Sequence, residues 1–275
     1  MKKLLAIVLS VLMLSGLVCV PVLAAENTDP VVYVTISDGD GKLVLVREKI
    51  TVKDSDNDGK LTITDALYCA HEKKYTGGAA AGYVTYASEF GISLSKLWGV
   101  ENGGSYGYYL NDNTAWSLTD EIKDGDCVNA FMYRDLSTWS DQYSFFDLKT
   151  ASVEAGNKIT LTLTTYCWNS AAAQNETVPV EGAVITVNGV ATEVKTDASG
   201  KATVTLDTAG EAIISATSDA LTLVPPVCTV IVNDTKTADD VGNTTPNYLI
   251  PILCGVAAVA LVAVASIVLV KRRKK

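Results

Sequence analysis

The sequence contains a single histidine, His71, among 275 residues, and this scarcity excludes most histidine-based chemistry. His71 stands two positions after Cys69 on an expected helix, so their side chains point to different faces and do not form a catalytic pair. The chain also lacks a His-Glu-x-x-His zinc motif and a phosphate-cradling glycine loop. We therefore predict a protein that is not an enzyme, with His71 as a solvated helix residue.

Positive charge is also scarce. The chain has 22 Lys and Arg residues against 31 Asp and Glu residues. Seven of the basic residues lie at the two ends, so the stretch between the ends carries 16 more acidic than basic residues. A region this acidic repels nucleic acid and anionic membrane surfaces, which excludes nucleic acid as a partner. It is compatible with divalent cations and with neutral or cationic ligands.

Both ends of the chain carry long apolar runs. Lys2 and Lys3 precede an apolar run that ends in Val22-Leu23-Ala24, which predicts a signal peptide over residues 1–24. The uncharged run 248–270 has about the twenty residues that a membrane-spanning helix needs. The basic residues 271–275 follow at once and indicate a cytoplasmic C-terminus. We expect a single-pass protein of the cell membrane, with residues 25–247 extracellular and residues 234–247 of this part forming a polar linker.

One acidic stretch has the spacing of a calcium loop. Residues 54–65 place carboxylates at loop positions one, three, five and twelve, with Gly59 at the sharp turn. Calcium takes six to eight oxygen ligands, and such a loop converges alternate side chains on one ion. An Asp/Asn-rich surface turn is the alternative, although it gives no reason for an acid at position twelve. The expected ligands are Asp54, Asp56, Asp58, the Lys60 carbonyl, Thr62 and Asp65.

The segments around this loop predict a strand before it and a helix after it. Residues 48–52 are typical of a strand, and residues 65–75 carry apolar side chains at helical spacing before the stop at Gly77-Gly78. The loop and its helix resemble one half of a dockerin repeat. The second copy that dockerins use for docking is absent from the sequence.

The residues before position 149 predict an α+β module. A strand over 31–36 and a turn over 38–41 lead to a strand around 43–46, which indicates a hairpin ahead of the calcium loop. Further strands are expected around 106–111 and 127–133. One helix with several strands is typical of a small α+β unit. We assign residues 25–148 to this module.

Residues 106–133 carry a family resemblance. A Tyr-Gly-Tyr-Tyr-Leu-Asn strand, a following Trp, an Asp-Gly-Asp turn and an aromatic-containing strand resemble the bacterial transcobalamin-like C-terminal domain family. The resemblance covers about 31–147 and implies a β-grasp-like fold. It also implies binding of a corrinoid or another flat, partly apolar ligand. The cobalamin carriers hold their ligand against a large helical domain, which this sequence lacks.

Four aromatic residues of this segment are candidate ligand contacts: Tyr106, Tyr108, Tyr109 and Trp116. Alternation along a strand places Tyr106 and Tyr108 on one face and Tyr109 on the other. The alternative interpretation is that one face packs the core while the other exposes a phenol to water. A ligand site requires these side chains to line a concave pocket.

The composition changes near residue 149, where Thr, Val and Ala replace the aromatic residues. Strict alternation over 158–164, the Asn188-Gly189 turn and the turn at 196–200 predict short strands joined by tight connections. This pattern is typical of a β-sandwich. Residues 180–189 and 196–204 resemble bacterial immunoglobulin-like repeats of surface proteins, which implies an all-β immunoglobulin-like module over 149–233.

Four cysteines lie in the expected extracellular region: Cys69, Cys127, Cys167 and Cys228. Two per module in an oxidising location permit bridges between Cys69 and Cys127 and between Cys167 and Cys228. Spacing leaves all three possible pairings open, and each residue is alternatively a free buried thiol.

Two functions fit these observations. The first is a bacterial cell-surface binding protein, whose calcium-braced module captures a small ligand such as a corrinoid while the sandwich lifts it from the membrane. The second is a structural or adhesive surface protein whose partner is another extracellular macromolecule. A concave aromatic pocket favours the first function, whereas core packing or a flat aromatic patch favours the second.

Overall fold

The computed structural model describes residues 29–88, 91–169 and 174–234. The expected signal peptide, membrane span and basic tail lie outside these ranges. The described residues up to Asn233 belong to one compact unit. Its described part is mostly β-sheet, with two helices, α2 (Ile63–Lys74) and α3 (Gly78–Gly82). Within the described ranges, neither helix has the length and apolar character needed to cross a bilayer.

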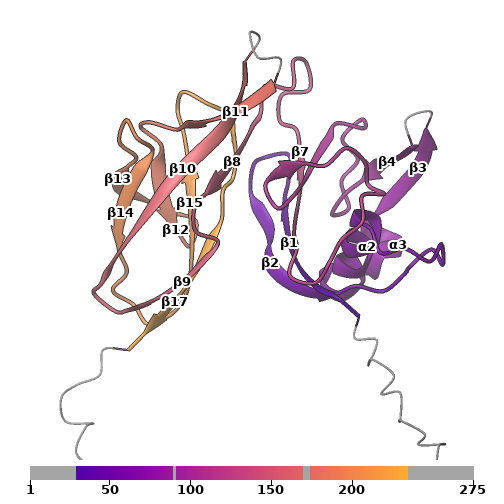
Figure 1. Ribbon diagram of the computed structural model, residues 1–275, viewed down its shortest axis with the longest axis horizontal. Coiled ribbons are helices and arrows are strands. Elements are labelled where there is room, and N and C mark those ends of the chain that lie inside the picture. The colour runs from indigo at the N-terminus through magenta and orange to yellow at the C-terminus, as the bar shows by residue number, and fades with distance from the viewer. Residues whose placement is uncertain (1–28, 89–90, 170–173, 235–275) are drawn as a thin grey trace, which may run out of the picture. The chain divides into compact units, whose positions relative to one another are not determined.

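A five-stranded mixed sheet forms the N-terminal module (Figure 1). Its strand order is β2-β1-β7-β5-β6, and β1 runs parallel to β7 while the other neighbours are antiparallel. The bounds of these strands are β1 (Val31–Ser37), β2 (Leu43–Thr51), β5 (Tyr106–Leu110), β6 (Asn113–Thr114) and β7 (Cys127–Met132). The expected hairpin at 31–46 is confirmed, and its second strand continues to Thr51.

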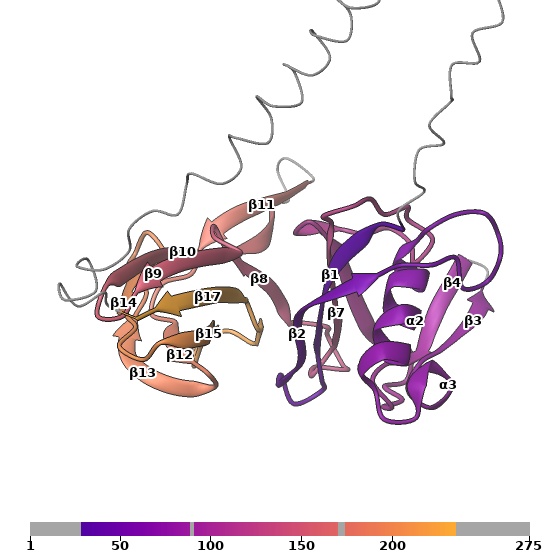
Figure 2. The same ribbon diagram turned by 90° about the horizontal axis from the view of Figure 1, so that it is seen from below.

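Helix α2 covers one face of this sheet (Figure 2). It begins after Thr62 because Asp65 accepts a hydrogen bond from the Thr62 backbone N–H, which closes the first turn. Its buried apolar residues, Ile63, Ala66 and Leu67, share one core with the sheet. Burying such side chains stabilises the fold by about 1.5–3 kcal/mol for each large aliphatic residue. A two-stranded ribbon of β3 (Val84–Ser88) and β4 (Gly91–Lys96) completes the module.

Two sheets packed face to face form the second module, as predicted for a sandwich. One sheet has the order β11-β10-β8-β16, with β14 also paired to β10, and the other has the order β13-β12-β15-β17-β9. Residues of both sheets meet in one core that includes Leu161, Leu163, Ile185, Ile214 and Val230. The strands of the first sheet are β8 (Gln142–Phe146), β10 (Lys158–Asn169), β11 (Gln174–Pro179), β14 (Lys201–Thr205) and β16 (Leu223–Val224). Those of the second are β9 (Thr150–Glu154), β12 (Val184–Val187), β13 (Val190–Lys195), β15 (Gly210–Thr217) and β17 (Cys228–Asn233).

The sandwich begins earlier than the boundary expected at residue 149. Strand β8 pairs with β10 and with β16, so it belongs to the sandwich although its sequence is rich in aromatic residues. Its residue Phe146 lies in the sandwich core, whereas Tyr143 on the same strand packs with Phe131 of β7. The aromatic residues of β8 contact the N-terminal module. For this reason a boundary drawn from the change in composition assigned β8 to that module and not to the sandwich.

Candidate functional site

The candidate calcium loop lies between the end of β2 and the start of α2, as the sequence predicts. Its first three acidic residues, Asp54, Asp56 and Asp58, bring carboxylate oxygens within 4.8 Å of one another. Backbone N–H groups hold them in place. The Gly59 N–H donates to Asp54 Oδ2 at 2.9 Å, and the Lys60 N–H donates to Asp58 Oδ1 at 2.8 Å. The loop thus folds back on itself and converges three carboxylates on one point.

Backbone conformation explains the glycine in this loop. Gly59 has a φ of 84°, and Asn57 two positions earlier has a φ of 61°. Residues other than Gly and Asn rarely adopt this left-handed backbone conformation. A Cβ at Gly59 would meet no heavy atom within 4 Å. Glycine is therefore required here for its conformation and not for space.

The structure places Asp65 apart from these three carboxylates. Asp65 is buried, with 1% of its surface exposed. Its Oδ1 accepts hydrogen bonds from the Ser55 N–H at 2.8 Å and the Ser55 hydroxyl at 2.7 Å. Its Oδ2 accepts bonds from the Thr62 N–H at 2.9 Å and the Thr62 hydroxyl at 2.8 Å. Asp65 thus ties the start of the loop to the start of α2 and lies outside the group of three converging carboxylates.

The two other expected ligands also have partners of their own. The Thr62 side chain is buried and directs its hydroxyl proton to Asp65, whereas Lys60 reaches Glu121 across an exposed ion pair of 3.4 Å. The structure therefore brings together three of the six expected ligands, and coordination by the Lys60 carbonyl and by Thr62 stays a prediction.

Proton affinities differ within the loop. Desolvation raises the pKa of Asp56 above its usual value, and the neighbouring charges of Asp58 and Asp65 act in the same direction. The Gly59 N–H lowers the pKa of Asp54, because the hydrogen bond favours the ionised carboxylate. A cation between these carboxylates would relieve the repulsion that raises the pKa of Asp56.

The four candidate aromatic residues do not line a common pocket. Tyr106 and Tyr108 lie on one face of β5 and pack against the core of the N-terminal module, as the alternation predicts for one face. The Tyr106 hydroxyl accepts a hydrogen bond from the Asn102 N–H at 2.7 Å and lies 2.9 Å from the Ser95 carbonyl oxygen. Tyr109 lies on the other face and stacks on Tyr143 of β8, with ring centroids 3.7 Å apart. These three tyrosines are structural residues in this arrangement.

Trp116 differs from the three tyrosines because 92% of its surface is exposed. Only its backbone is fixed, by a hydrogen bond of 2.9 Å from its N–H to Asp120 Oδ2. Two further aromatic side chains, Tyr86 and Trp139, are 49% and 58% exposed. We refer to Tyr86, Trp116 and Trp139 together as the exposed aromatic residues.

Tyr86 and Trp139 both lie near the turn at residues 103–105. The Tyr86 hydroxyl lies 3.9 Å from the position that a Cβ would take at Gly104. The Trp139 Nε1–H donates to the Ser105 hydroxyl at 3.3 Å. Around Trp139, the Asp135 carboxylate accepts hydrogen bonds from several Ser and Thr residues, which lowers its pKa far below the usual range. The loop that presents Trp139 is thus held by its own hydrogen bonds.

A set of polar contacts that has no signal in the sequence joins the N-terminal module to the sandwich. Asp112, in the turn between β5 and β6, forms an ion pair with Lys149 and accepts a hydrogen bond of 2.9 Å from the Tyr143 hydroxyl. Its carbonyl accepts a bond of 2.7 Å from the Tyr166 hydroxyl. Positive φ angles at Asn111 and Asp112 mark the turn. The sequence signals this turn but carries no signal for its distant partners.

His71 is buried, in contrast to the solvated position expected from the sequence. None of its surface is exposed. Its Nε2 accepts the Trp98 N–H at 2.9 Å, so its Nδ1 carries the proton and donates to the Leu67 carbonyl at 2.6 Å. Burial lowers the pKa of this imidazole, which favours its neutral form. His71 therefore joins α2 to the segment after β4 as a neutral structural residue.

Neither expected disulfide bond is present. Cys69 directs its thiol to the Lys53 carbonyl at 3.8 Å, and Cys127 accepts a hydrogen bond from the Arg47 guanidinium at 3.4 Å. Cys228 is a thiol buried in the sandwich core, and burial raises its pKa to about 11. Cys167 is exposed, on β10. The pairings of Cys69 with Cys127 and of Cys167 with Cys228 are therefore not formed.

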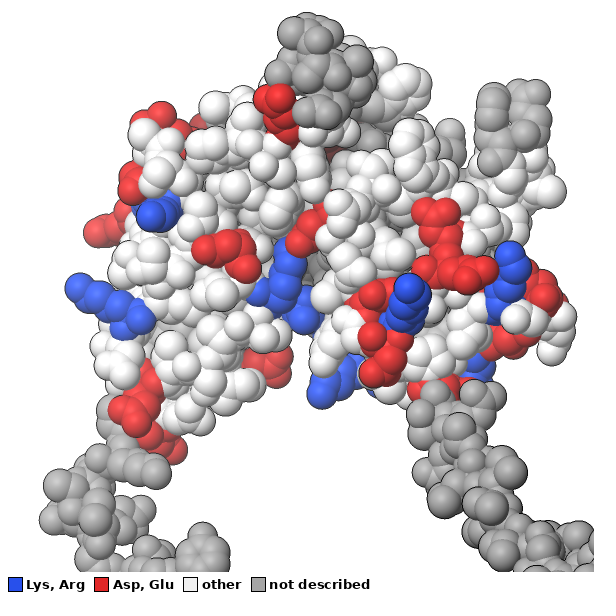
Figure 3. All heavy atoms as spheres, viewed as in Figure 1, with Lys and Arg blue, Asp and Glu red and all other residues white. Residues whose placement is uncertain are grey.

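Figure 3 shows the charges on one face of the molecule, where acidic side chains outnumber basic ones on the N-terminal module. Basic side chains on this face are few and separate. No basic stripe of the kind that follows a nucleic-acid backbone is visible there. The distribution on this face agrees with the acidic composition of the sequence.

No protein-family model matches the chain. No curated protein matches it either. Among solved structures, the chain is similar to the ectodomain of the teleost fish polymeric Ig receptor, at 12% identity and a TM-score of 0.20 over 56% of this chain and 74% of that chain. It is also similar to the four N-terminal Ig domains of Dscam1, at 11% identity and a TM-score of 0.20 over 55% of this chain and 32% of that chain. The D0-D1 domain of intimin matches at 16% identity and a TM-score of 0.25, over 55% of this chain and 80% of that chain. Similarities this weak carry no argument about function.

Proposed function

We propose that this chain is an exported, membrane-anchored surface protein that binds a macromolecular partner and catalyses no reaction. The placement of the four candidate aromatic residues supports this function best. Tyr106 and Tyr108 are half-buried against a core, Tyr109 stacks on Tyr143, and Trp116 lies in solvent. This is the core-and-surface arrangement expected of an adhesive or structural protein. A small-ligand carrier would need a concave aromatic pocket.

The exposed aromatic residues are the proposed contact points. Large aromatic side chains lose little conformational entropy on binding and bury much apolar area, so they are frequent anchors of protein interfaces. Because 92% of the surface of Trp116 faces water, its side chain contributes little to the packing of the fold. Tyr86 and Trp139 both lie near the turn at residues 103–105, and Trp139 donates a hydrogen bond to Ser105. We assign to them the recognition of a neutral or cationic macromolecule, because the acidic module repels polyanions.

Calcium is the proposed cofactor of the N-terminal module. Three carboxylates converge within 4.8 Å at the loop that connects β2 to α2. A bound ion would complete its coordination with the Lys60 carbonyl, Thr62 or water, since Asp65 is occupied by its four hydrogen bonds. Binding only to the folded state would stabilise the module without any role in partner recognition.

The second module is proposed to be an immunoglobulin-like spacer. Two antiparallel-rich sheets around one apolar core give a stiff unit between the N-terminal module and the expected membrane anchor. The signal peptide over 1–24, the span over 248–270 and the cytoplasmic tail over 271–275 belong to this proposal, and they lie outside the described residues.

Corrinoid capture by a transcobalamin-like module is the second candidate. The observation in its favour is the strand order β2-β1-β7-β5 with a parallel central pair and a helix on one face, which is the order of a β-grasp sheet. The fold alone does not establish the ligand. The four aromatic residues proposed to hold it do not converge, so we rank it behind macromolecular binding.

The test is a solid-phase binding assay with the full chain in lipid nanodiscs and calcium in the buffer. The probes are purified matrix proteins, mucins and neutral polysaccharides. We expect at least one probe to bind the wild type, and Trp116→Ala or Trp139→Ala to reduce that binding by about tenfold or more, as for an interface anchor. Val190→Ala is the matched control, because Val190 is an exposed apolar residue of the sandwich, 69% exposed. Equal binding by all three variants would exclude the proposed contact surface.

A further inference from the structure

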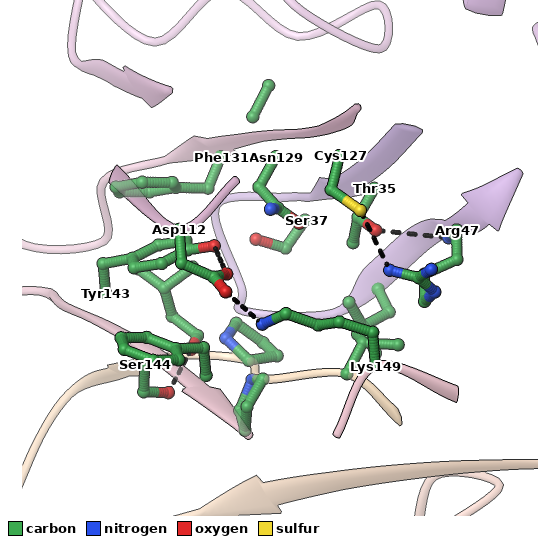
Figure 4. Close-up of a pocket in the computed structure, with 17 residues that line it drawn as sticks. Thr35, Ser37, Arg47, Asp112, Cys127, Asn129, Phe131, Tyr143, Ser144 and Lys149 are labelled. Carbon is green, nitrogen blue, oxygen red and sulfur yellow. Dashed lines mark hydrogen bonds and ion pairs between the residues drawn. The ribbon is translucent and has the colours of Figure 1, made fainter. Parts of the chain in front are cut away.

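A small cavity lies where the sheet of the N-terminal module meets β8 and the segment before β17 (Figure 4). Its volume is about 20 Å³. A cavity needs about 10–15 Å³ to hold one particle of the size of a water molecule. The space therefore has room for a small ion or a water molecule.

Polar groups that lack partners line this cavity. Ser37 on β1 is buried, with 3% of its surface exposed, and its hydroxyl forms no hydrogen bond. The Nε of Arg47 on β2 is likewise buried without a partner. Figure 4 shows the Ser37 hydroxyl and the Asn129 side chain facing the same space as the Lys149 ammonium group. An unpaired buried polar group costs about 1–3 kcal/mol, so such a cluster points to an occupant.

The charges that line the cavity identify the kind of occupant. The lining residues include two positively charged side chains, Arg47 and Lys149, and one carboxylate, that of Asp112. The Asp112 carboxylate already accepts the Tyr143 hydroxyl on one oxygen and pairs with Lys149 on the other. One positive charge is left without a counterion among the lining residues. The groups that remain available are mainly N–H and O–H donors, which suit an anion better than a metal cation.

We propose that this cavity binds a single monoatomic anion, chloride in the first instance. The Ser37 hydroxyl, the Asn129 amide and the Lys149 ammonium group donate to it, because they face the same space in Figure 4. Ser37, Arg47 and Asn129 belong to the N-terminal module, whereas Lys149 belongs to the segment between β8 and β9. The anion thus joins the N-terminal module to the sandwich. This inference is independent of the proposed function.

The test is chloride NMR on the full chain in chloride-free detergent, to which sodium chloride and then sodium bromide are added. Chloride that exchanges with a protein site relaxes faster, so its resonance broadens, and bromide competes for the same site. We expect broadening in the wild type that bromide removes. We expect Ser37→Ala to reduce this displaceable broadening several-fold. Ser144→Ala is the matched control, because Ser144 lines the same cavity but gives its proton to the Val224 carbonyl at 2.7 Å.

Three results would overturn the assignment. A wild-type protein without bromide-displaceable broadening would show that the cavity holds a buried water only. Broadening of equal size in Ser37→Ala would place the anion elsewhere on the chain. Equal loss in Ser37→Ala and Ser144→Ala would indicate general loosening of the cavity wall. Circular dichroism spectra of the variants distinguish unfolding from loss of the anion, and the bromide competition on the wild type needs no variant at all.

Discussion

Replacing Asp65 with alanine should destabilise the N-terminal module whether or not calcium is present. The substitution removes the acceptor of four hydrogen bonds, two from Ser55 and two from Thr62. Thr62 is buried, so its N–H and hydroxyl would lose their partner without gaining water, whereas Ser55 is only partly buried. Each buried donor left unpaired costs about 1–3 kcal/mol, which gives a loss of about 2–6 kcal/mol for the two donors of Thr62.

Asp58 provides the comparison, because its carboxylate lies on the exposed side of the loop and accepts one hydrogen bond from the Lys60 N–H. In a calcium chelator, Asp58→Ala should leave the stability almost unchanged. In calcium, it should lose the stabilisation that the wild type gains from the ion. Asp65→Asn keeps an acceptor oxygen at one of the two carboxylate positions. Its stability should therefore lie between that of the wild type and that of Asp65→Ala.

Urea unfolding of the full chain, followed by tryptophan fluorescence, measures these effects with calcium and with chelator. We expect Asp65→Ala to lower the urea midpoint of unfolding strongly under both conditions. We expect Asp58→Ala to lower it only when calcium is present. If Asp65→Ala lost stability only in calcium, Asp65 would be a metal ligand and the role assigned to its hydrogen bonds would be wrong.

Three further predictions concern the packing around the site. His71 is buried and its pKa is lowered. The unfolded state therefore takes up more protons than the folded state as the pH falls below about 6.5, and the urea midpoint of unfolding should decrease between neutral pH and about pH 5. A pH dependence of equal size in His71→Gln would contradict this. Tyr143→Phe removes the hydrogen bond to Asp112 and should cost about 0.5–1.5 kcal/mol in urea unfolding while the stack on Tyr109 is kept; an unchanged midpoint would show that this bond adds no stability. Gly107→Ala places a Cβ 2.1 Å from the Phe131 ring and should lower the stability by about 1–3 kcal/mol; a melting temperature equal to that of the wild type would show that the ring moves freely.

The order of strand, loop and helix around residues 48–75 could be predicted because each signal is local. Alternation defines β2, the spacing of Asp54, Asp56 and Asp58 defines the loop, and apolar residues at helical spacing define α2. The sandwich was predictable for the same reason, since each of its turns has its own signal in the sequence. Local patterns of this kind need no knowledge of distant partners.

Residues whose roles depend on tertiary contacts could not be predicted. Asp65 has the position of a calcium ligand, but the sequence gives no sign of its burial or of its hydrogen bonds with Ser55 and Thr62. His71 is on the buried face of α2 because the Trp98 N–H reaches it from a segment 27 residues away. Asp112 stands in an ordinary polar turn, and nothing near it indicates Lys149 or Tyr143. Pairs that are distant in the sequence leave no periodic pattern.

Calorimetric titration of a corrinoid into the full chain, in detergent and with calcium present, tests most directly whether the N-terminal module works through its surface or through an interior ligand site. We expect no saturable heat, because Tyr106, Tyr108 and Tyr109 pack against other residues and Trp116 faces solvent. Saturable heat that a calcium chelator abolishes would contradict the account. It would identify the module as a calcium-dependent corrinoid carrier in place of an adhesive surface.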